Sequence, residues 1–193
     1  QENIEEIISS LELDFMKKVT ARKSFVEAEY QTTRGLLALD DGQITPNYPK
    51  GVDGEPTSHA AGGKPDIECF YSDYNMTCEV TLLSTEQQWK AESQSVPEHF
   101  EKFIAKNKKE KNFCLFIAPK LHERAVREFY TINTWEEEKF GRHIPITISQ
   151  FQQILRSLKE LRETKKRGIT QKEMCLFYQR VSDSMKEFSG GKF

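Results

Sequence analysis

Residues 62–83 read GGKPDIECFYSDYNMTCEVTLL, and this stretch decides the fold because it has the composition of a β-hairpin. Three carboxylates, Asp66, Glu68 and Glu79, lie among its apolar, strand-forming residues. A carboxylate in apolar surroundings is costly unless a positive group pairs with it. No Lys or Arg lies between residues 65 and 89, so the hairpin itself supplies no such partner.

The register of the hairpin decides which side chains share a face. An even-length turn centred on Asp73–Tyr74 pairs residue 66 with 81 and residue 68 with 79, which places Asp66, Glu68, Glu79 and Thr81 on one face. Like charges opposite one another in a sheet repel, so this face favours a cation. Oxygen ligands with room for water and a phosphate oxygen fit Mg²⁺. The alternative is an exposed face whose acids meet only water.

The regions around the hairpin alternate between helical and strand-like patterns. Apolar periodicity and capping patterns predict helices at residues 3–19, 24–39, 84–93, 95–107, 120–131, 149–161 and 170–188. Two of these helices carry capping boxes, SFVE from Ser24 and TQKE from Thr170. Pro97 is predicted to restart a helix at its first turn. Residues 42–65 are rich in Gly and Pro and predict a long functional loop.

Two further strands complete the expected fold. The continuous apolar run NFCLFIAP at 112–119 is typical of a strand buried on both faces, and a short strand is expected at 144–147. Strands between helices predict an α/β fold, with a central mixed β-sheet that contains the hairpin and is flanked by helices. We expect one domain over residues 1–193, with an N-terminal helix in 1–23 and a C-terminal helical appendage in 163–193. Because the chain opens on Gln1, we expect it to be trimmed from a longer one.

Composition narrows the range of partners. The net charge of −2 excludes a strongly basic nucleic-acid binder, so affinity for DNA must come from local patches or from another part of a parent protein. The four cysteines and four histidines have no zinc-binding spacing, which favours reduced core cysteines. We find no signal-peptide pattern and no apolar run of membrane-spanning length. The expected location is therefore the cytoplasm, of bacterial type, with no membrane partner.

The order of these motifs resembles a known family. PD at 65–66 followed by EVT at 79–81 resembles the core of the PD-(D/E)XK nuclease superfamily. The wider string, AAGGKPDIE, EVTLL, Gln88, Glu92 and SVPEHF, resembles the cleavage domains of AlwI-type type IIS restriction endonucleases. It is also similar to the small subunits of heterodimeric nicking endonucleases. The resemblance covers roughly residues 25–155, and it implies a restriction-endonuclease-like fold and Mg²⁺-dependent hydrolysis of double-stranded DNA.

The resemblance also implies roles for individual residues. Asp66, Glu79 and Glu29 are expected to hold Mg²⁺. Glu29 is the candidate for the helix carboxylate that such nucleases often add, because it lies on the apolar stripe formed by Val26, Tyr30, Thr33, Leu36 and Leu37. Thr81 stands where these nucleases commonly carry Lys, so another group must supply what the ammonium gives. Gln88 is the candidate for positioning water or phosphate, and its alternative is a solvated helix residue.

Three features stay open at this point. Glu68 and Glu92 have no assigned role, and helix packing is favoured for His99 over phosphate contact or proton relay. The leading prediction is the cleavage domain of a type II (IIS) site-specific deoxyribonuclease whose specificity lies in another domain. The alternatives are a free-standing small subunit that acts with a larger subunit, and a catalytically inactive dimerisation module. Double-strand cleavage is expected to need a homodimer or heterodimer.

Overall fold

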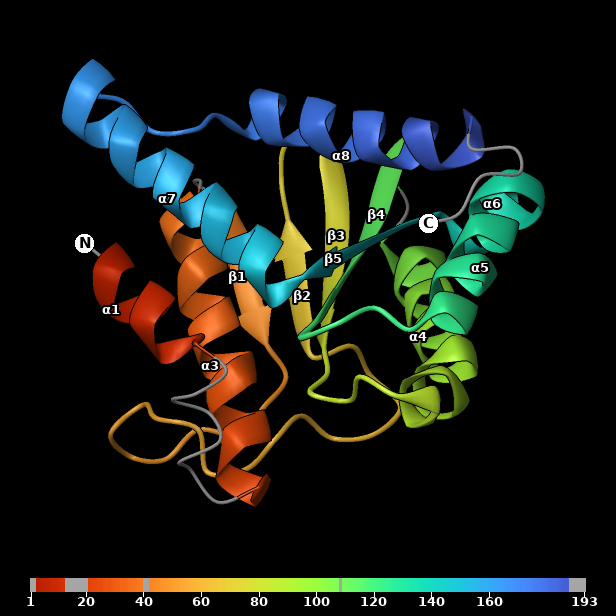
Figure 1. Ribbon diagram of the computed structural model, residues 1–193, viewed down its shortest axis with the longest axis horizontal. Coiled ribbons are helices and arrows are strands. Elements are labelled where there is room, and N and C mark those ends of the chain that lie inside the picture. The colour runs from red at the N-terminus through yellow and green to blue at the C-terminus, as the bar shows by residue number, and fades with distance from the viewer. Residues whose placement is uncertain (1–2, 13–20, 40–41, 108, 188–193) are drawn as a thin grey trace.

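A five-stranded mixed β-sheet lies at the centre of the computed structural model, which describes residues 3–12, 21–39, 42–107 and 109–187 (Figure 1). The strands follow chain order across the sheet: β1 (Gln43–Pro46), β2 (Ile67–Phe70), β3 (Tyr74–Val80), β4 (Lys111–Ala118) and β5 (Arg142–Thr147). The first three strands pair antiparallel, and β3, β4 and β5 pair parallel. The predicted mixed sheet with an internal hairpin is confirmed.

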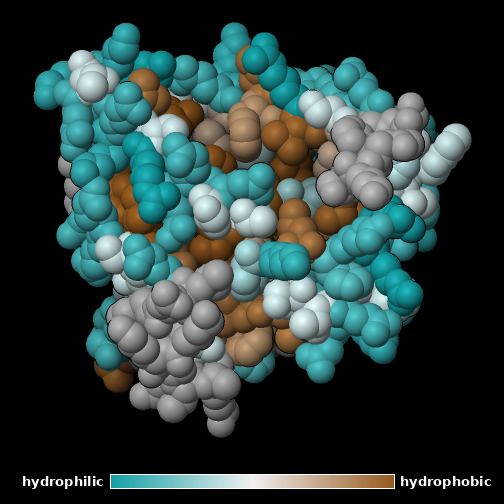
Figure 2. Space-filling view, in the orientation of Figure 1, coloured by the Kyte–Doolittle hydropathy of each residue, from teal (hydrophilic) through white to brown (hydrophobic). Residues whose placement is uncertain are grey.

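Helices cover both faces of this sheet. They are α1 (Ile4–Ser10), α3 (Ala21–Leu39), α4 (Glu86–Lys106), α5 (Glu123–Thr131), the π-helical turn η1 (Ile132–Glu136), α6 (Glu137–Phe140), α7 (Ile148–Lys165) and α8 (Gln171–Glu187). One apolar core joins α1, α3, α7 and α8 to the sheet, and a second joins α4, α5 and η1 to the opposite face of β4. Figure 1 shows α1, α3 and α7 on one side of the strands and α4, α5 and α6 on the other, with α8 running across the top of the sheet. Hydrophilic residues cover most of the surface in the same view, with apolar residues gathered toward its centre (Figure 2).

The hairpin register differs from the prediction by two residues. Glu68 lies opposite Thr77 rather than Glu79, and Ile67 lies opposite Cys78. The turn is therefore centred one residue earlier than Asp73–Tyr74, and the Tyr71 amide donates to the Tyr74 carbonyl at 3.1 Å. Since side chains alternate with a period of two, a shift of two leaves every side chain on its predicted face.

The segment before the hairpin corrects two predictions. Because α3 begins at Ala21, Ser24 lies within the helix, and the predicted capping box at Ser24 is wrong. Glu27 instead accepts a hydrogen bond from Gln31 at 2.7 Å, one helical turn away. Residues 42–65 are also not loop throughout, because β1 extends the sheet beside β2. The predicted end of the helix at Leu39 is confirmed.

The segment after the hairpin is one helix rather than two. Thr85 caps α4, and the helix runs without interruption to Lys106, so Pro97 lies inside it. Pro97 therefore does not restart a helix. Pro97 leaves α4 with one backbone hydrogen bond fewer, because proline has no N–H to donate to the carbonyl four residues earlier.

The remaining elements follow the predictions closely. The strand expected at 112–119 is β4, and the capping box at Thr170 forms, with Glu173 accepting from the Thr170 amide at 2.9 Å. The cap of α7 is Thr147, not Ser149. The predicted helix at 3–19 is α1 in its first part, and residues 13–19 lie outside the described residues. No helix in the described ranges is long and apolar enough to cross a membrane.

Candidate active site

Asp66 and Glu79 are brought together at the open end of the β2–β3 hairpin. The Asp66 carboxylate accepts a hydrogen bond from the Val80 amide at 2.7 Å, and the Asp66 amide hydrogen-bonds to the Glu79 carboxylate. The backbone at this point is fixed by Asn47, which donates through its amide to the Asp66 carbonyl and through its side chain to the Pro65 carbonyl, both at 2.8 Å. The first two predicted metal ligands are therefore adjacent and held by backbone geometry.

Glu29 reaches the same place from α3. Its side chain is buried, and Oε2 accepts the Ala60 amide at 2.9 Å. The prediction that Glu29 faces inward is confirmed, because Thr33 and Leu36 on the same helix face are also buried. Leu37 was expected on this stripe but is 46% exposed, so the stripe is narrower than predicted.

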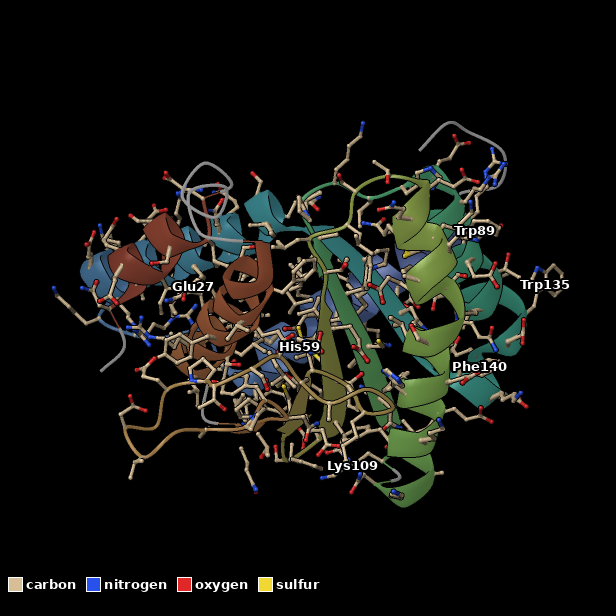
Figure 3. All side chains as sticks on the ribbon, turned by 90° about the horizontal axis from the view of Figure 1, so that it is seen from below. Glu27, His59, Trp89, Lys109, Trp135 and Phe140 are labelled. Atoms are coloured by element: carbon tan, nitrogen blue, oxygen red, sulfur yellow. The ribbon has the colours of Figure 1, made fainter. Side chains whose placement is uncertain are left out.

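Helix α4 adds two side chains that had no predicted role here. His99 Nδ1 lies 3.0 Å from Glu79 Oε1. Glu92 lies near the Thr81 and Ser95 hydroxyl groups, which favour its charged form, although burial raises its pKa overall. Residues 92 and 99 are seven apart, two turns of one helix, and so share a face. The sequence contained this signal, but the predicted break at Pro97 concealed it. Figure 3 shows α4 and α3 on opposite sides of the strands.

The polar groups of Thr81 and Gln88 form hydrogen bonds within the protein. Thr81 is buried, and its Oγ1 accepts the Leu83 amide at 3.2 Å and lies near Glu92. Gln88 is fully buried, so it is not a solvated helix residue.

The Gln88 amide group ties two loops together. Its Nε2 donates to the Leu83 and Lys120 carbonyls, and its Oε1 accepts the His122 amide at 2.7 Å. Both amide hydrogens of Gln88 are thus used on backbone, which favours fixing the loops after β3 and β4 over positioning a water. Glu68 is half-buried on the face shared with Glu79, opposite Thr45 and Thr77.

The electrostatics of the cluster favour protonation or a cation. Burial, together with the nearby charges of Glu29 and Glu92, raises the pKa of Asp66 to about 8. Burial together with Asp66 raises the pKa of Glu79 well above its usual range, and burial raises the pKa of Glu29 to about 7. Within the described part of the chain no Lys or Arg pairs with these four acids. The basic side chain in contact with them is His99, and burial lowers the pKa of His99, so its contact with Glu79 is a hydrogen bond of a neutral ring.

The donor set fits a hard divalent cation such as Mg²⁺. It consists of carboxylate oxygens, and two of the carboxylates converge from adjacent strands. In the described ranges no group of three or more His, Cys, Asp or Glu side chains is arranged so that it could hold a metal ion. Mg²⁺ does not require one, because it commonly binds one or two carboxylates and completes its octahedron with waters and substrate phosphate oxygens.

A mixed sheet with carboxylates at the open end of its hairpin defines a restriction-endonuclease-like fold. The crystal structure of the small subunit (R.BspD6I2) of the heterodimeric restriction endonuclease R.BspD6I has the same fold, with a TM-score of 0.76 and 19% sequence identity. The alignment covers 95% of this chain and 94% of that chain. The sequence matches the AlwI restriction endonuclease family over residues 2–154, so this chain belongs to that family. The resemblance predicted from the motifs is confirmed, and no curated protein sequence matches.

Proposed function

We propose that this chain hydrolyses phosphodiester bonds in double-stranded DNA with Mg²⁺, as the catalytic unit of a type II restriction endonuclease. One observation carries the proposal: Glu29, Asp66, Glu79 and Glu92 converge on one end of the sheet without a Lys or Arg partner among the described residues. Such a cluster is expensive unless a cation completes it. Membership of a restriction endonuclease family supports the same reaction.

Asp66 and Glu79 would hold the metal, as their adjacent carboxylates suggest. Bound Mg²⁺ supplies a water of lowered pKa and neutralises charge on the phosphate oxygens. Glu29, whose pKa is raised to about 7, lies across from this pair and is suited to accept the proton of an attacking water near neutral pH.

The residues of α4 orient this arrangement. His99 holds Glu79 through the 3.0 Å contact, which limits the rotation of a carboxylate that must keep one orientation toward the metal. Glu92 lies near the Thr81 hydroxyl, the group that replaces the ammonium common in such nucleases. Through these contacts α4 would hold in place the hairpin side chains that face the metal.

One such centre cuts one strand at a time, so double-strand cleavage would need a second centre. The leading form is a type IIS cleavage domain whose specificity lies in a separate domain. The second form is a small subunit that acts beside a larger one. The match along nearly the whole length of the R.BspD6I small subunit favours this second form.

The test is cleavage of plasmid DNA with Mg²⁺, with and without the recognition partner, by the wild type and by Asp66→Asn. We expect nicked and linear products only from the wild type. A catalytically inactive dimerisation module would leave the plasmid intact in every reaction while still binding its partner, and this result would overturn the proposed function.

A further inference from the structure

Among the described residues no Lys or Arg is paired with the carboxylate cluster, where the basic neighbours are His59 and His99. Thr81 cannot supply a positive charge, because its hydroxyl is neutral and accepts the Leu83 amide. A DNA phosphate would bring further negative charge to an end of the sheet that already carries Glu29, Asp66 and Glu79. A metal offsets part of this charge, but the flanking phosphate oxygens still favour a cationic side chain.

One short segment passes the cluster and carries a lysine. Residues 61–64, AGGK, connect two points fixed at the site itself: Ala60, whose amide binds Glu29 at 2.9 Å, and Asp66. Two residues of extended chain span at most about 7 Å, so the Lys64 backbone lies within roughly 7 Å of the Asp66 backbone. In Figure 3 this part of the chain, with His59 labelled on it, crosses in front of the strands between α3 and α4.

Residues 61–64 carry a glycine that neither backbone conformation nor packing within the fold explains. Gly63 has a φ of 87°, which explains its glycine. Gly62 has no positive φ, and a Cβ placed there would meet no atom within 4 Å. Neither backbone conformation nor internal packing therefore accounts for the glycine at 62. Ala61 and Lys64 are both exposed. A polymer backbone approaching from outside would account for this absence of side chains.

We propose that Lys64 contacts a phosphate of the DNA strand held at the carboxylate cluster and supplies the positive charge that Thr81 does not. The proposal rests on the proposed nuclease function and adds a substrate-contacting residue to it. The Lys64 ammonium acts as a point charge on a flexible stem, anchored at its base by the Asn47 contacts to residues 65–66. Lys50 lies in the same connection but over the Tyr48 ring, 6.0 Å from its centroid, and serves as a control.

The first measurement is the single-turnover cleavage rate of the full chain fused to a DNA-binding domain of known target, so that DNA affinity is held constant. Lys64→Ala should slow cleavage about 100-fold, the scale seen when one charge-stabilising donor is removed. Lys64→Arg should recover most of the rate, and Lys50→Ala should match the wild type. Equal rates for Lys64→Ala and Lys50→Ala would overturn the proposal.

The second measurement does not depend on cleavage. The Asp66→Asn fusion is treated with an amine-acylating reagent with and without bound target DNA, and each lysine is quantified by mass spectrometry. DNA should protect Lys64 and leave Lys50 unchanged. If the wild type cuts nothing with Mg²⁺ but Lys64 is protected, the nuclease function fails and the phosphate contact stands. Equal labelling of Lys64 in both states would overturn the contact.

Discussion

The molecule buries ionisable groups in two regions, and it treats them in opposite ways. At the hairpin, carboxylates are buried beside other carboxylates, and each is held by a backbone or side-chain hydrogen bond. In the second region, His143 on β5 is fully buried between Phe129, stacked at 5.2 Å, and Phe100, edge-on at 5.5 Å. The Gly141 backbone lies near the ring, but neither ring nitrogen of His143 has a well-aligned hydrogen bond within the described residues.

The difference shows which burial serves the fold and which serves chemistry. Burying His143 does not incur the cost of desolvating a charge, because burial lowers its pKa to about 3 and the ring stays neutral. The carboxylates cannot all stay neutral near pH 8, and hydrogen bonds such as that from Val80 favour the charged form of Asp66. The His143 region is complete as it stands, whereas the carboxylates at the hairpin need a proton or a cation.

The largest effect is expected from removing a ligand at the hairpin. Asp66→Asn and Glu79→Gln should each lower the cleavage rate on the order of 1000-fold or more, because the metal loses a carboxylate. The free energy of unfolding should stay unchanged or rise, because charge repulsion falls. Plasmid cleavage and urea unfolding measure the two effects, and calorimetry should show weakened Mg²⁺ binding. Equal Mg²⁺ binding by wild type and variants would contradict the assignment.

Glu29 and Glu27 form a matched pair on one helix. Glu29→Gln should slow cleavage about 100-fold, because Glu29 faces the cluster and can accept a proton there. Glu27→Gln should leave cleavage nearly normal and cost at most about 0.5 kcal/mol, because it alters only the contact with Gln31 on the same helix. Both variants are tested in the same cleavage assay. If both keep full activity, α3 contributes no carboxylate to the reaction.

The free energy of unfolding should depend on pH in opposite directions for the two regions. The carboxylates at the hairpin give the larger effect. Asp66 and Glu29 have folded-state pKa values raised to about 8 and about 7, above their unfolded values of 3.8 and 4.5. The folded state therefore binds more protons in this window, and stability should fall as pH rises through it. Mg²⁺ should restore stability at the high end, because it binds only the folded state. Thermal unfolding of wild type and Asp66→Asn, with and without Mg²⁺, measures this. A wild type unaffected by Mg²⁺ above pH 8 would count against the site.

His143 should give a smaller effect of the opposite sign. Its folded-state pKa, lowered to about 3 from 6.5, means that stability is lost as pH falls through this window, by up to about 1.4 kcal/mol per pH unit. His143→Phe keeps the aromatic packing and should be less sensitive to acid than the wild type. Urea unfolding across this pH range measures the difference. Equal acid sensitivity in both proteins would show that the ring is not buried neutral.

Local patterns in the sequence predicted strands β2 to β5 and the shared face of Asp66 and Glu79, but neither β1 nor the α4 residues around the two carboxylates. Asp66 and Glu79 were predictable because a hairpin brings both onto one face, and a register error of two residues does not change the face. Glu92 and His99 were missed because a proline inside a helix is rare, and the pattern at Pro97 equally describes a helix start. The backbone role of Gln88 depends on the loop after β4, 32 residues away, and no local pattern reports that contact.

Pro97 has a mechanical consequence for the site. It lies between Glu92 and His99, the two α4 residues that reach the hairpin, and it leaves the turn between them one backbone hydrogen bond short. Bending stiffness in a helix comes from that ladder of bonds, so α4 is most compliant where it separates its two site residues. A small flexure there changes the distance between the group that orients Glu79 and the group that reaches Thr81. One half of α4 therefore contacts Glu79 near the end of β3, and the other half lies near Thr81, just after that strand.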